Sequence, residues 1–573
     1  MKKIWKVLEA NPRLQKVLCS ELGVSPIFAQ LLVNRNIRTP EQAQMFLFGE
    51  LRSCHDPFLL KGMAESVSRI KKAVAEKEKI LIYGDYDVDG VTSTALLSYI
   101  LDEMGADYDT FIPNRLEDGY GFNIRAVHLA RERGIGLIIT VDCGINSFKE
   151  VQCAGDYGID VVITDHHEIK GDDVPPAFAI IDAHQPHCKY PYKHLAGVGV
   201  VYKLARALME GREELADSHL DLVALGTIAD IAPLDGENRI LAKWGLKRLR
   251  ETDKYGLKAL MDVARISPEA LASRHISFIL GPRINAMGRV GSADVALDLF
   301  MCRDQAKARS IAEVLERENR NRQAIEKNLL SEVKRLTKEE IDIEESGVLV
   351  LAGDGWHPGV LGIVAAKISE EYGLPAILIT MKDGKGKGSG RSVEGFNLFE
   401  ALKETSSHLI DFGGHEAACG IKIRADEVDG FRKTLTSVAR RHFAQGKAVS
   451  PAMEIDVNVP FSHIGVKLVK ELQMLMPYGQ QNAEPVFSTN GIQVKNNPRN
   501  IGRDGFKFLA TCGNLTCEVI TFRKRKVAKP PRGSIIDLAY TPHINRWEGI
   551  ETIQLNVKDL QLVTRGDVLT FRP

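Results

Sequence analysis

The stretch that decides the fold of this chain is KILIYGDYDVDG, residues 79–90. It opens with a short continuous apolar run, and three further runs rich in Ile and Val follow: GLIITVDCG (136–144), DVVITDHH (160–167) and AFAIIDAH (177–184). Segments with helical periodicity separate these runs. Continuous apolar strands that alternate with helices are typical of a parallel sheet covered on both faces. The sequence therefore predicts an α/β domain at residues 76–300.

Three carboxylates follow the first strand at alternate positions. Asp85, Asp87 and Asp89 point to one side if the extended conformation continues through them. Three like charges in one place are unfavourable unless cations neutralise them. Gly90 permits a tight turn into a helix that begins near Val91, and a helix N-terminus facing this site would favour phosphate. A solvated acidic turn is the alternative, which the buried character of the strand disfavours.

Further apolar runs also end in residues that bind metals. Asp142, the triplet Asp165-His166-His167 and Asp230 each follow such a run. In an open parallel sheet, ligands bind outside the carboxyl ends of the strands, so these side chains are expected to meet. Carboxylates with one or two imidazoles suit Mg²⁺ or Mn²⁺ better than a structural zinc. The set offers enough ligands for two divalent cations that share a carboxylate, an arrangement that catalyses phosphodiester displacement.

The rest of the chain divides into regions that differ in composition and hydrophobic pattern. Residues 292–346 contain neither Gly nor Pro, which predicts a connecting helix at 301–346; two helices with a polar turn at Asn319–Asn321 are the alternative. A second, smaller α/β unit is predicted at 347–448. Strict polar and apolar alternation in Thr552–Lys558 predicts a small all-β barrel or sandwich at 449–573. Residues 1–75 are expected to be helical and rich in loops, without a motif.

Charge is balanced overall and uneven along the chain. The 573 residues include 75 Lys and Arg against 75 Asp and Glu, yet residues 451–573 carry 16 basic against 11 acidic side chains. The run Arg523, Lys524, Arg525, Lys526 lies in this basic region, near Phe506, Phe508, Phe522 and Trp547. Basic charge among aromatic residues predicts a platform for single-stranded nucleic acid. A solvated β-turn with core aromatics is the alternative.

Several classes of protein are disfavoured. Hydrophobic residues make up 44% of the chain, which excludes disorder throughout. We find no apolar window near the roughly 20 residues that a bilayer span needs and no signal-peptide core. The nine scattered cysteines are expected to be reduced in a cytoplasmic protein. The glycine-rich stretches at 197–199 and 384–392 lack the endings of dinucleotide-binding and P-loop motifs.

Four motifs occur in a characteristic order: DYDVDG (85–90), VDCG (141–144), TDHH (164–167) and GTIAD (226–230). Together they resemble the motifs of the DHH phosphoesterase superfamily. The similarity extends through LAGVGVVYKL, GPRINAMGR, WHPGVLGIVA, GSGRS and GGHEAACG into PYGQQNAEPVF. Nearly the whole chain is therefore similar to the bacterial single-strand-specific exonucleases of that superfamily.

The resemblance implies a DHH domain, a connecting helix, a DHHA1 domain and an OB-fold. It also implies an enzyme that degrades single-stranded DNA from the 5′ end, releases 5′-mononucleotides and acts in DNA repair and recombination. Implied partners are a single-strand-binding protein and a helicase that supplies single strands, and no membrane.

The resemblance also implies roles for individual residues. The implied ligands of one cation are Asp85, Asp87 and Asp142, and those of the other are Asp89, Asp142, His166 and Asp230. His167 is expected to contact the scissile phosphate, and Asp165 to orient an imidazole. The implied contacts to the DNA strand are Arg115, Tyr120, Arg283, Asn285, His357, Arg391, Ser392 and His415. For Asn285 a structural role is equally open.

Some alternatives remain. In IDAHQPHCKYP, which departs from the family's Asn-Pro, we interpret His184, His187 and Cys188 as loop residues, because no fourth metal ligand is nearby in the sequence. A small-substrate phosphodiesterase acting on oligoribonucleotides or cyclic dinucleotides is a rival function, which the β-rich tail disfavours. A catalytically inactive DNA-binding scaffold is another, and loss of the carboxylates would mark it.

Overall fold

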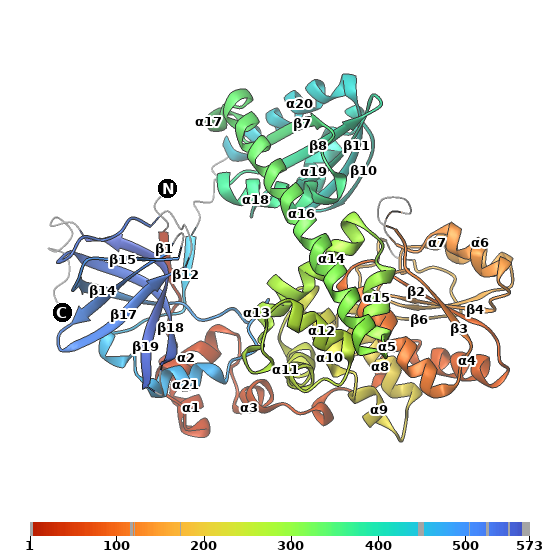
Figure 1. Ribbon diagram of the computed structural model, residues 1–573, viewed down its shortest axis with the longest axis horizontal. Helices are drawn as coiled ribbons and strands as arrows, with labels where there is room; N and C mark the ends of the chain where they lie inside the picture. Colours follow the sequence, from red (N-terminus) through yellow and green to blue (C-terminus); the bar gives the residue numbers. More distant parts are fainter. Residues whose placement is uncertain are drawn as a thin grey trace. The chain divides into compact units, whose positions relative to one another are not determined.

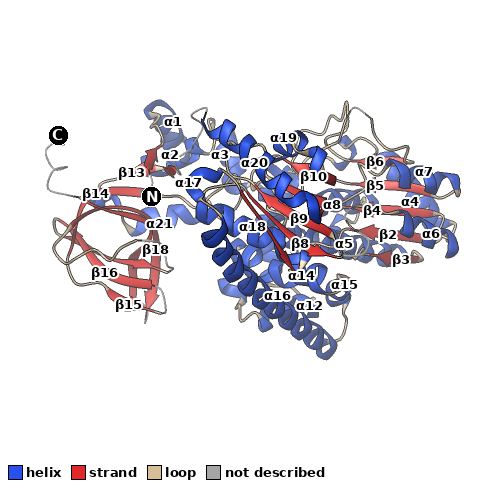
Figure 2. Cartoon of the chain, turned by 90° about the horizontal axis from the view of Figure 1, so that it is seen from above, coloured by secondary structure: helices blue, strands red, loops and turns tan. Residues whose placement is uncertain are grey.

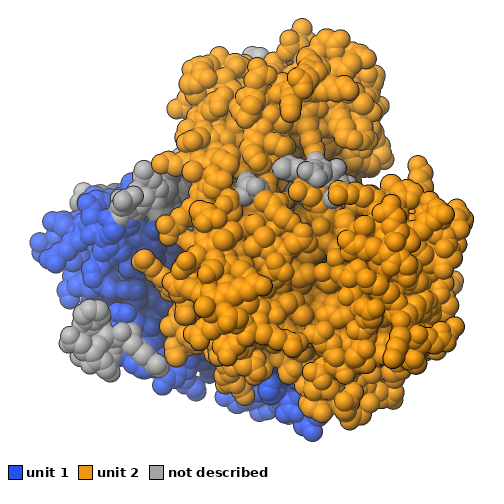
Figure 3. Space-filling model, turned by 45° about the vertical axis from the view of Figure 1, so that its right-hand side comes forward, with its two compact units in different colours: residues 1–55, 231–244, 452–573 blue, residues 56–230, 245–451 orange. Residues whose placement is uncertain are grey.

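The computed structural model describes residues 4–114, 119, 121–171, 173–444, 452–502, 505–522, 527–547 and 550–563. Arg115, Tyr120 and the run Arg523–Lys526 lie outside the described residues. The chain forms two compact units (Figure 3): unit 1 comprises Met1–His55, Ile231–Trp244 and Ala452–Pro573, and unit 2 comprises Asp56–Asp230 and Gly245–Pro451. Segments from both ends of the chain therefore share one unit.

Unit 2 contains the predicted parallel sheet. Its strands are β2 (Ile80–Gly84), β3 (Tyr108–Phe111), β4 (Leu137–Val141), β5 (Asp160–Thr164) and β6 (Ala179–Ile181), in the order β3-β2-β4-β5-β6 (Figure 2). All four pairings are parallel. The residues of β2 and β4 are buried throughout, which explains why these strands are apolar without alternation.

Helices cover both faces of this sheet. One face packs against α4 (Met63–Ala75), α5 (Val88–Met104) and α8 (Gly197–Leu208), and the other against α6 (Ile124–Glu132) and α7 (Phe148–Asp156) (Figure 1). The chain continues through α9 (Glu213–Asp217), α10 (Leu220–Ala229), α11 (Gly236–Arg250), α12 (Tyr255–Val263), α13 (Ser273–His275), a π-helical turn (Ile276–Leu280), α14 (Gly281–Val290) and α15 (Asp294–Met301). The prediction of an α/β domain is confirmed.

One unbroken helix, α16 (Gln305–Glu340), leads from this helical part to the second sheet (Figure 1). Asp304 caps it, since its side chain accepts a hydrogen bond from the Lys307 N–H. Asn319 is buried in the middle of the helix and accepts hydrogen bonds from Arg322. The prediction of a connecting helix is confirmed, and the alternative of a turn at Asn319–Asn321 is wrong.

The second, smaller α/β domain, which is also part of unit 2, is built on a mixed sheet in the order β10-β11-β9-β8-β7. Its strands are β7 (Leu349–Asp354), β8 (Ala376–Lys382), β9 (Lys385–Arg391), β10 (Leu409–His415) and β11 (Ala418–Arg424), and its helices are α17 (Ile343–Ser346), α18 (Pro358–Tyr372), α19 (Leu398–Glu404) and α20 (Val428–His442). Glycines alternate along β9 because side chains of its neighbours fill that face: a Cβ at Gly390 would lie 2.6 Å from Cys419 Sγ.

The C-terminal part of unit 1 is an all-β barrel, as predicted. Pairing of β14 with β16 closes five strands into a ring in the order β14-β18-β19-β17-β16. The strands of this region are β13 (Val457–Asn458), β14 (Phe487–Val494), β15 (Arg499–Ile501), β16 (Gly505–Cys512), β17 (Leu515–Thr521), β18 (Ile535–Trp547) and β19 (Ile550–Leu562). Phe506 and Phe508 are buried in its core, which excludes them from the predicted base-stacking platform, whereas Phe522 is 65% exposed.

The N-terminal segment shares the core of unit 1. It contributes β1 (Ile4–Val7), α1 (Pro12–Leu22), α2 (Pro26–Asn34) and α3 (Pro40–Phe48), which join β12 (Ala452–Ile455) and α21 (Val466–Gln473). The buried guanidinium of Arg239 donates hydrogen bonds to the carbonyl oxygens of Phe46, Met474, Leu475, Met476 and Pro477. Burial lowers the pKa of Arg239 to about 9.

Within the described ranges, no single helix is long and apolar enough to cross a bilayer; α1 and α2 meet that criterion only as a pair bent by 115°.

Candidate metal centre

The first carboxylates lie between β2 and α5, in a connection of three residues. Asp87 is the N-cap of α5, and its Oδ1 accepts hydrogen bonds from the N–H groups of Asp89 (2.9 Å) and Gly90 (3.1 Å). The helix thus begins at Val88, earlier than predicted, and Asp89 lies in its first turn rather than on an extended strand. A Cβ at Gly90 would lie 2.4 Å from the Asp85 carbonyl oxygen, so the turn requires glycine there.

Asp89 also holds the start of a second helix. Its carboxylate accepts hydrogen bonds from the N–H groups of Gly197 (2.7 Å) and Val198 (2.9 Å), the first residues of α8. Ala196, at the N-cap position, provides no side-chain hydrogen bond, so Asp89 replaces the missing cap. A Cβ at Gly197 would lie 2.5 Å from Asp142 Oδ1. The Gly-Val-Gly stretch therefore serves close packing against two carboxylates, a role that its sequence alone did not reveal.

Asp142 follows β4 in a left-handed backbone conformation, with φ of 61°. Its N–H donates to the carbonyl oxygen of Thr164 at 3.0 Å, and its side chain is buried. Aspartate and asparagine tolerate this conformation better than other residues that carry a Cβ. Such strain is found at functional sites when the surrounding structure enforces it.

The histidines after β5 are held from both sides. Oδ1 of buried Asp165 accepts hydrogen bonds from the His166 N–H (2.7 Å) and from Nδ1 of His167 (2.7 Å), and Oδ2 accepts one from the Ile145 N–H (2.9 Å). Nε2 of His166 lies 3.1 Å from Asp142 Oδ1 and 3.9 Å from Asp89 Oδ2.

Asp230 joins the same site from the C-cap of α10. Candidate ligand atoms within 4.8 Å of one another form three groups: Asp85, Asp87 and Asp142; Asp89, His166 and Asp230; and Asp142, His166 and His167. The structure thus brings all six predicted ligands together. Asp85, Asp142 and His166 follow parallel strands, as predicted. The apolar run before Asp230 is the helix α10 and not a strand as predicted, so Asp230 reaches the site from a helix C-terminus.

Burial and mutual repulsion dominate the electrostatics of the carboxylates. Burial, with repulsion from Asp87, raises the pKa of Asp89 to about 7. Burial and the charge of Asp89 raise the pKa of Asp230 to about 9, and the same two causes raise that of Asp142 well above its ordinary value. Such a cluster of buried carboxylates has an excess of negative charge. The donor set therefore fits divalent cations, whose charge reverses these shifts.

The two histidines differ sharply. Burial lowers the pKa of His166 to about 4, which leaves a neutral imidazole suited to bind a metal. Burial acts in the same direction on His167, but the hydrogen bond and charge of Asp165 outweigh it and raise its pKa to about 9. Burial alone would raise the pKa of Asp165, whereas the hydrogen bond from His167 holds it at about 2.

Two residues of α14 that are predicted to contact the DNA strand, Arg283 and Asn285, have partners inside the protein. The guanidinium of Arg283 lies 2.8 Å from Glu316 Oε2 and donates to the Ile279 carbonyl oxygen at 2.7 Å. Oδ1 of Asn285 accepts a hydrogen bond from the Val88 N–H at 3.2 Å. Asn285 therefore supports the turn that carries the first carboxylates.

The other predicted contacts lie in the second α/β unit. His357 caps α18 through Nδ1, which accepts from the Gly359 N–H at 3.1 Å, and Arg391 lies beside Gly362 of the same helix. The Ser392 hydroxyl donates to the Phe396 carbonyl oxygen at 2.6 Å, and His415 is exposed at the end of β10. His357 and Arg391 thus both lie at the N-terminal end of α18.

Comparisons with known proteins agree with this architecture. Models of the DHH family N-terminal domain, the DHHA1 domain and the RecJ OB domain match residues 79–227, 345–441 and 455–559. The parallel sheet with its carboxylate edge, followed by these two domains, defines a nuclease of the DHH class.

The single-stranded-DNA-specific exonuclease RecJ of Bacillus subtilis (strain 168) is 39% identical over 566 residues, which cover 97% of this chain and 70% of that protein. RecJ of Escherichia coli (strain K12) is 33% identical over 93% of this chain and 96% of its own length. The crystal structure of RecJ from Thermus thermophilus in complex with Mn²⁺ matches with a TM-score of 0.81 and 30% identity, over 97% of this chain and 79% of that one. The chain belongs to the RecJ family of single-stranded-DNA-specific exonucleases.

Proposed function

We propose that this protein removes 5′-mononucleotides from single-stranded DNA in the 5′→3′ direction by hydrolysis that depends on two divalent cations. The convergence of six predicted ligands into groups of three, with Asp142 and His166 each in two of them, carries the proposal. Residues 76–300 form the catalytic domain, 301–346 the connecting helix, 347–448 the DHHA1 domain and 449–573 the nucleic-acid-binding domain, after an N-terminal region at 1–75.

Each cation has its own ligand set in this proposal. Asp85 and Asp87 hold one, and Asp89, His166 and Asp230 hold the other, with Asp142 shared. When bound, the cations activate the attacking water and neutralise charge on the phosphate. Asp165 fixes His167 through Nδ1, and in this proposal Nε2 of His167 contacts an oxygen of the scissile phosphate. Asp89 and Asn285 hold the backbone elements that carry the ligands.

The remaining strand contacts are assigned to basic and polar side chains. These are Arg115, Tyr120, Arg283, Asn285, His357, Arg391, Ser392 and His415, with the run Arg523–Lys526 in the tail. Arg283 contributes only those N–H groups that Glu316 and Ile279 do not use. We place the protein in DNA repair and recombination in the cytoplasm, with a helicase supplying single strands and a single-strand-binding protein covering them.

The direct test is digestion of single strands labelled at the 5′ or the 3′ end, with Mn²⁺, with Mg²⁺ and with neither. We expect labelled mononucleotide at the earliest times from the 5′-labelled strand only, and only with a metal. A blunt duplex of the same sequence is the control and is expected to resist. Early release from the 3′ label would refute the polarity, and release without metal would refute the mechanism.

The tail gives a separable prediction. Neutralising Arg523, Lys524, Arg525 and Lys526 leaves every proposed metal ligand in place but removes positive charge that can pair with phosphates. Binding of long single strands should weaken, and the slope of its salt dependence should fall by about 0.7 for each phosphate that is no longer neutralised. Cleavage of very short oligonucleotides should change little. Anisotropy titrations at several salt concentrations measure the slope, and equal defects on short and long strands would indicate a structural role for the run.

A further inference from the structure

A second aspartate–histidine pair lies on the strand next to β5. Thr164 of β5 is opposite Ile181 of β6, so Asp165 and Asp182 hold equivalent positions just beyond the two strands. His184 follows Asp182 at the spacing at which His167 follows Asp165. The neighbouring strand ends therefore present the same pair of residues side by side.

The hydrogen bonds of the two pairs also match. Oδ1 of Asp182 accepts from the His184 N–H (2.7 Å) and from its Nδ1 (3.2 Å), as Oδ1 of Asp165 does from the His167 N–H (3.2 Å) and Nδ1 (2.7 Å). Both aspartates are buried, whereas the imidazoles are 27% and 38% exposed. In each pair the aspartate holds Nδ1, so Nε2 is the ring nitrogen on the side away from the aspartate. The hydrogen bond to Asp182 raises the pKa of His184, which favours the cationic ring.

The loop that carries His184 is held rigidly. The side-chain amide of Gln185 donates to the carbonyl oxygens of Ile180 (2.7 Å) and Asp182 (3.3 Å). Nζ of Lys193 donates to the carbonyl oxygens of Ala183 (2.8 Å) and Cys188 (2.9 Å), on either side of the turn. A ring on such a loop needs little ordering when it binds.

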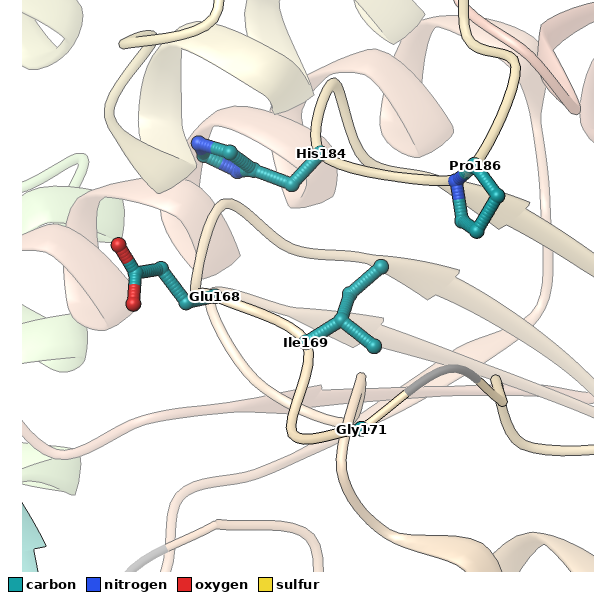
Figure 4. A pocket seen from close by; sticks show the side chains of 5 residues that line it. All are labelled: Glu168, Ile169, Gly171, His184 and Pro186. Atoms are coloured by element: carbon teal, nitrogen blue, oxygen red, sulfur yellow. The ribbon is translucent and has the colours of Figure 1, made fainter.

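His184 lines an open pocket of about 460 Å³ together with Glu168, Ile169, Gly171 and Pro186 (Figure 4). The imidazole of His184 and the carboxylate of Glu168 extend to the same side of the pocket from neighbouring loops (Figure 4). The pocket adjoins the metal centre, because its lining residues Glu168 and Ile169 directly follow His166 and His167 in the same loop.

The charges around the pocket allow an anion. Asp182 is hydrogen-bonded to His184 and compensates its charge, and Glu168 is exposed, so the Glu168 side chain can turn into solvent. Lys193 supplies a second cation at the loop and makes no ion pair with any carboxylate in the described part of the chain. The pocket lining therefore offers one fixed ring, that of His184, and one exposed carboxylate, that of Glu168. Lys193 is not among the lining residues and adds positive charge from the loop that carries His184.

We propose that His184 binds a phosphate of the DNA strand that is adjacent to the scissile phosphate, with Lys193 adding to the positive field. The inference rests on the proposed function, in which the cations and His167 engage the scissile phosphate. A DNA strand bound there carries its next phosphate one nucleotide away. The Asp182–His184 pair just beyond β6 is placed to receive that phosphate. His184 is then a binding residue rather than a passive loop residue.

Binding can be measured apart from cleavage by fluorescence anisotropy of a labelled oligonucleotide in chelator. His184→Ala should weaken binding about tenfold, because it removes a charge-assisted hydrogen bond to phosphate. His184→Gln, which keeps a neutral donor, should lose less. His187→Asn is the matched control, because His187 is exposed in the same loop with φ of 62°, which asparagine tolerates. The affinity of this variant for the oligonucleotide should equal that of the wild type. With metal present, the His184→Ala defect should appear in KM, with kcat within about twofold.

Oligonucleotides with one neutral methylphosphonate linkage identify the phosphate that His184 contacts. At one linkage beside the scissile one, neutralisation should weaken binding of the wild type but have no further effect on His184→Ala. If every linkage affects both proteins equally, or if His184→Ala binds as the wild type does, the inference is wrong. His184→Gln supports the same comparison if the alanine variant does not fold. Failure of the wild type to cleave with metal would refute the proposed function. The comparison of wild-type and His184→Ala binding to the two kinds of oligonucleotide would still decide the role of His184.

Discussion

Replacing Asp142 by asparagine is expected to lower the rate of single-strand hydrolysis by at least three orders of magnitude, about 4 kcal/mol of transition-state stabilisation. Asp142 is the carboxylate shared by the two proposed cation sites, and its Oδ1 also lies 3.1 Å from Nε2 of His166. Loss of its charge weakens both sites at once. Asparagine is the preferred substitution because φ is 61° at this position, where alanine adds backbone strain.

Binding of single-stranded DNA should persist in this variant, because Arg391, His415 and the basic tail are unchanged. Removing a negative charge near the phosphates also reduces repulsion, so affinity is expected to stay equal or to rise. Asp156→Asn, on the exposed face of α7, is the matched control and should cleave at the wild-type rate. An Asp142→Asn protein that cleaves within tenfold of the control would rule out the shared-carboxylate assignment.

Removing divalent metal is expected to abolish the nuclease activity, and restoring Mn²⁺ or Mg²⁺ should recover it. Five of the six proposed ligands are carboxylates that repel one another, and the cationic ring of His167 compensates only part of their charge. The structure therefore fits a site in which added cations supply the charge that phosphate binding needs. Assays after exhaustive chelation, followed by titration with each metal, measure the requirement. Full activity in chelator would contradict the metal-dependent mechanism.

The same cluster predicts how metal binding changes with pH. In the metal-free protein the pKa values of Asp89 and Asp230 are about 7 and about 9, both above the value of an aspartate in the unfolded chain. The contribution of these protonated groups to stability is complete below about pH 4 and is lost as the pH rises through about 7 to about 9.

Cations displace these protons, so the rise in Tm that Mn²⁺ produces should increase between about pH 6 and about pH 9. Thermal melts with and without metal at each pH measure this difference. The Asp142→Asn protein, which retains Asp89 and Asp230 but loses the shared ligand, should show a smaller rise at every pH. A metal-induced shift that does not vary with pH would count against buried carboxylates as the ligands.

Strand polarity and periodicity explain how much of the centre can be predicted. Short apolar runs indicated a parallel sheet, and the residues that follow parallel strands must meet at one edge, so Asp85, Asp142 and His166 could be grouped without coordinates. The sequence pattern is less informative for Asp89 and Asp230, because it predicts that each continues or follows an extended strand, whereas the structure places them in the first turn of α5 and at the C-cap of α10. The chain turns at Asp87 instead, and Asp89 reaches the site from the first turn of α5.

The sequence by itself determined the alternation of strands and helices, the helical character of the connecting segment and the residue types at the carboxyl edge of the sheet. These follow from local periodicity and from the absence of helix-breaking residues, which neighbours in the chain are sufficient to reveal. Only the tertiary structure decided that Asp89 caps α8, that Gly197 makes room for Asp142 and that Asp182 and His184 repeat the pair beside them. It also decided that the two ends of the chain share one unit. These features depend on contacts between residues far apart in the chain, and such contacts arise from packing rather than from local pattern.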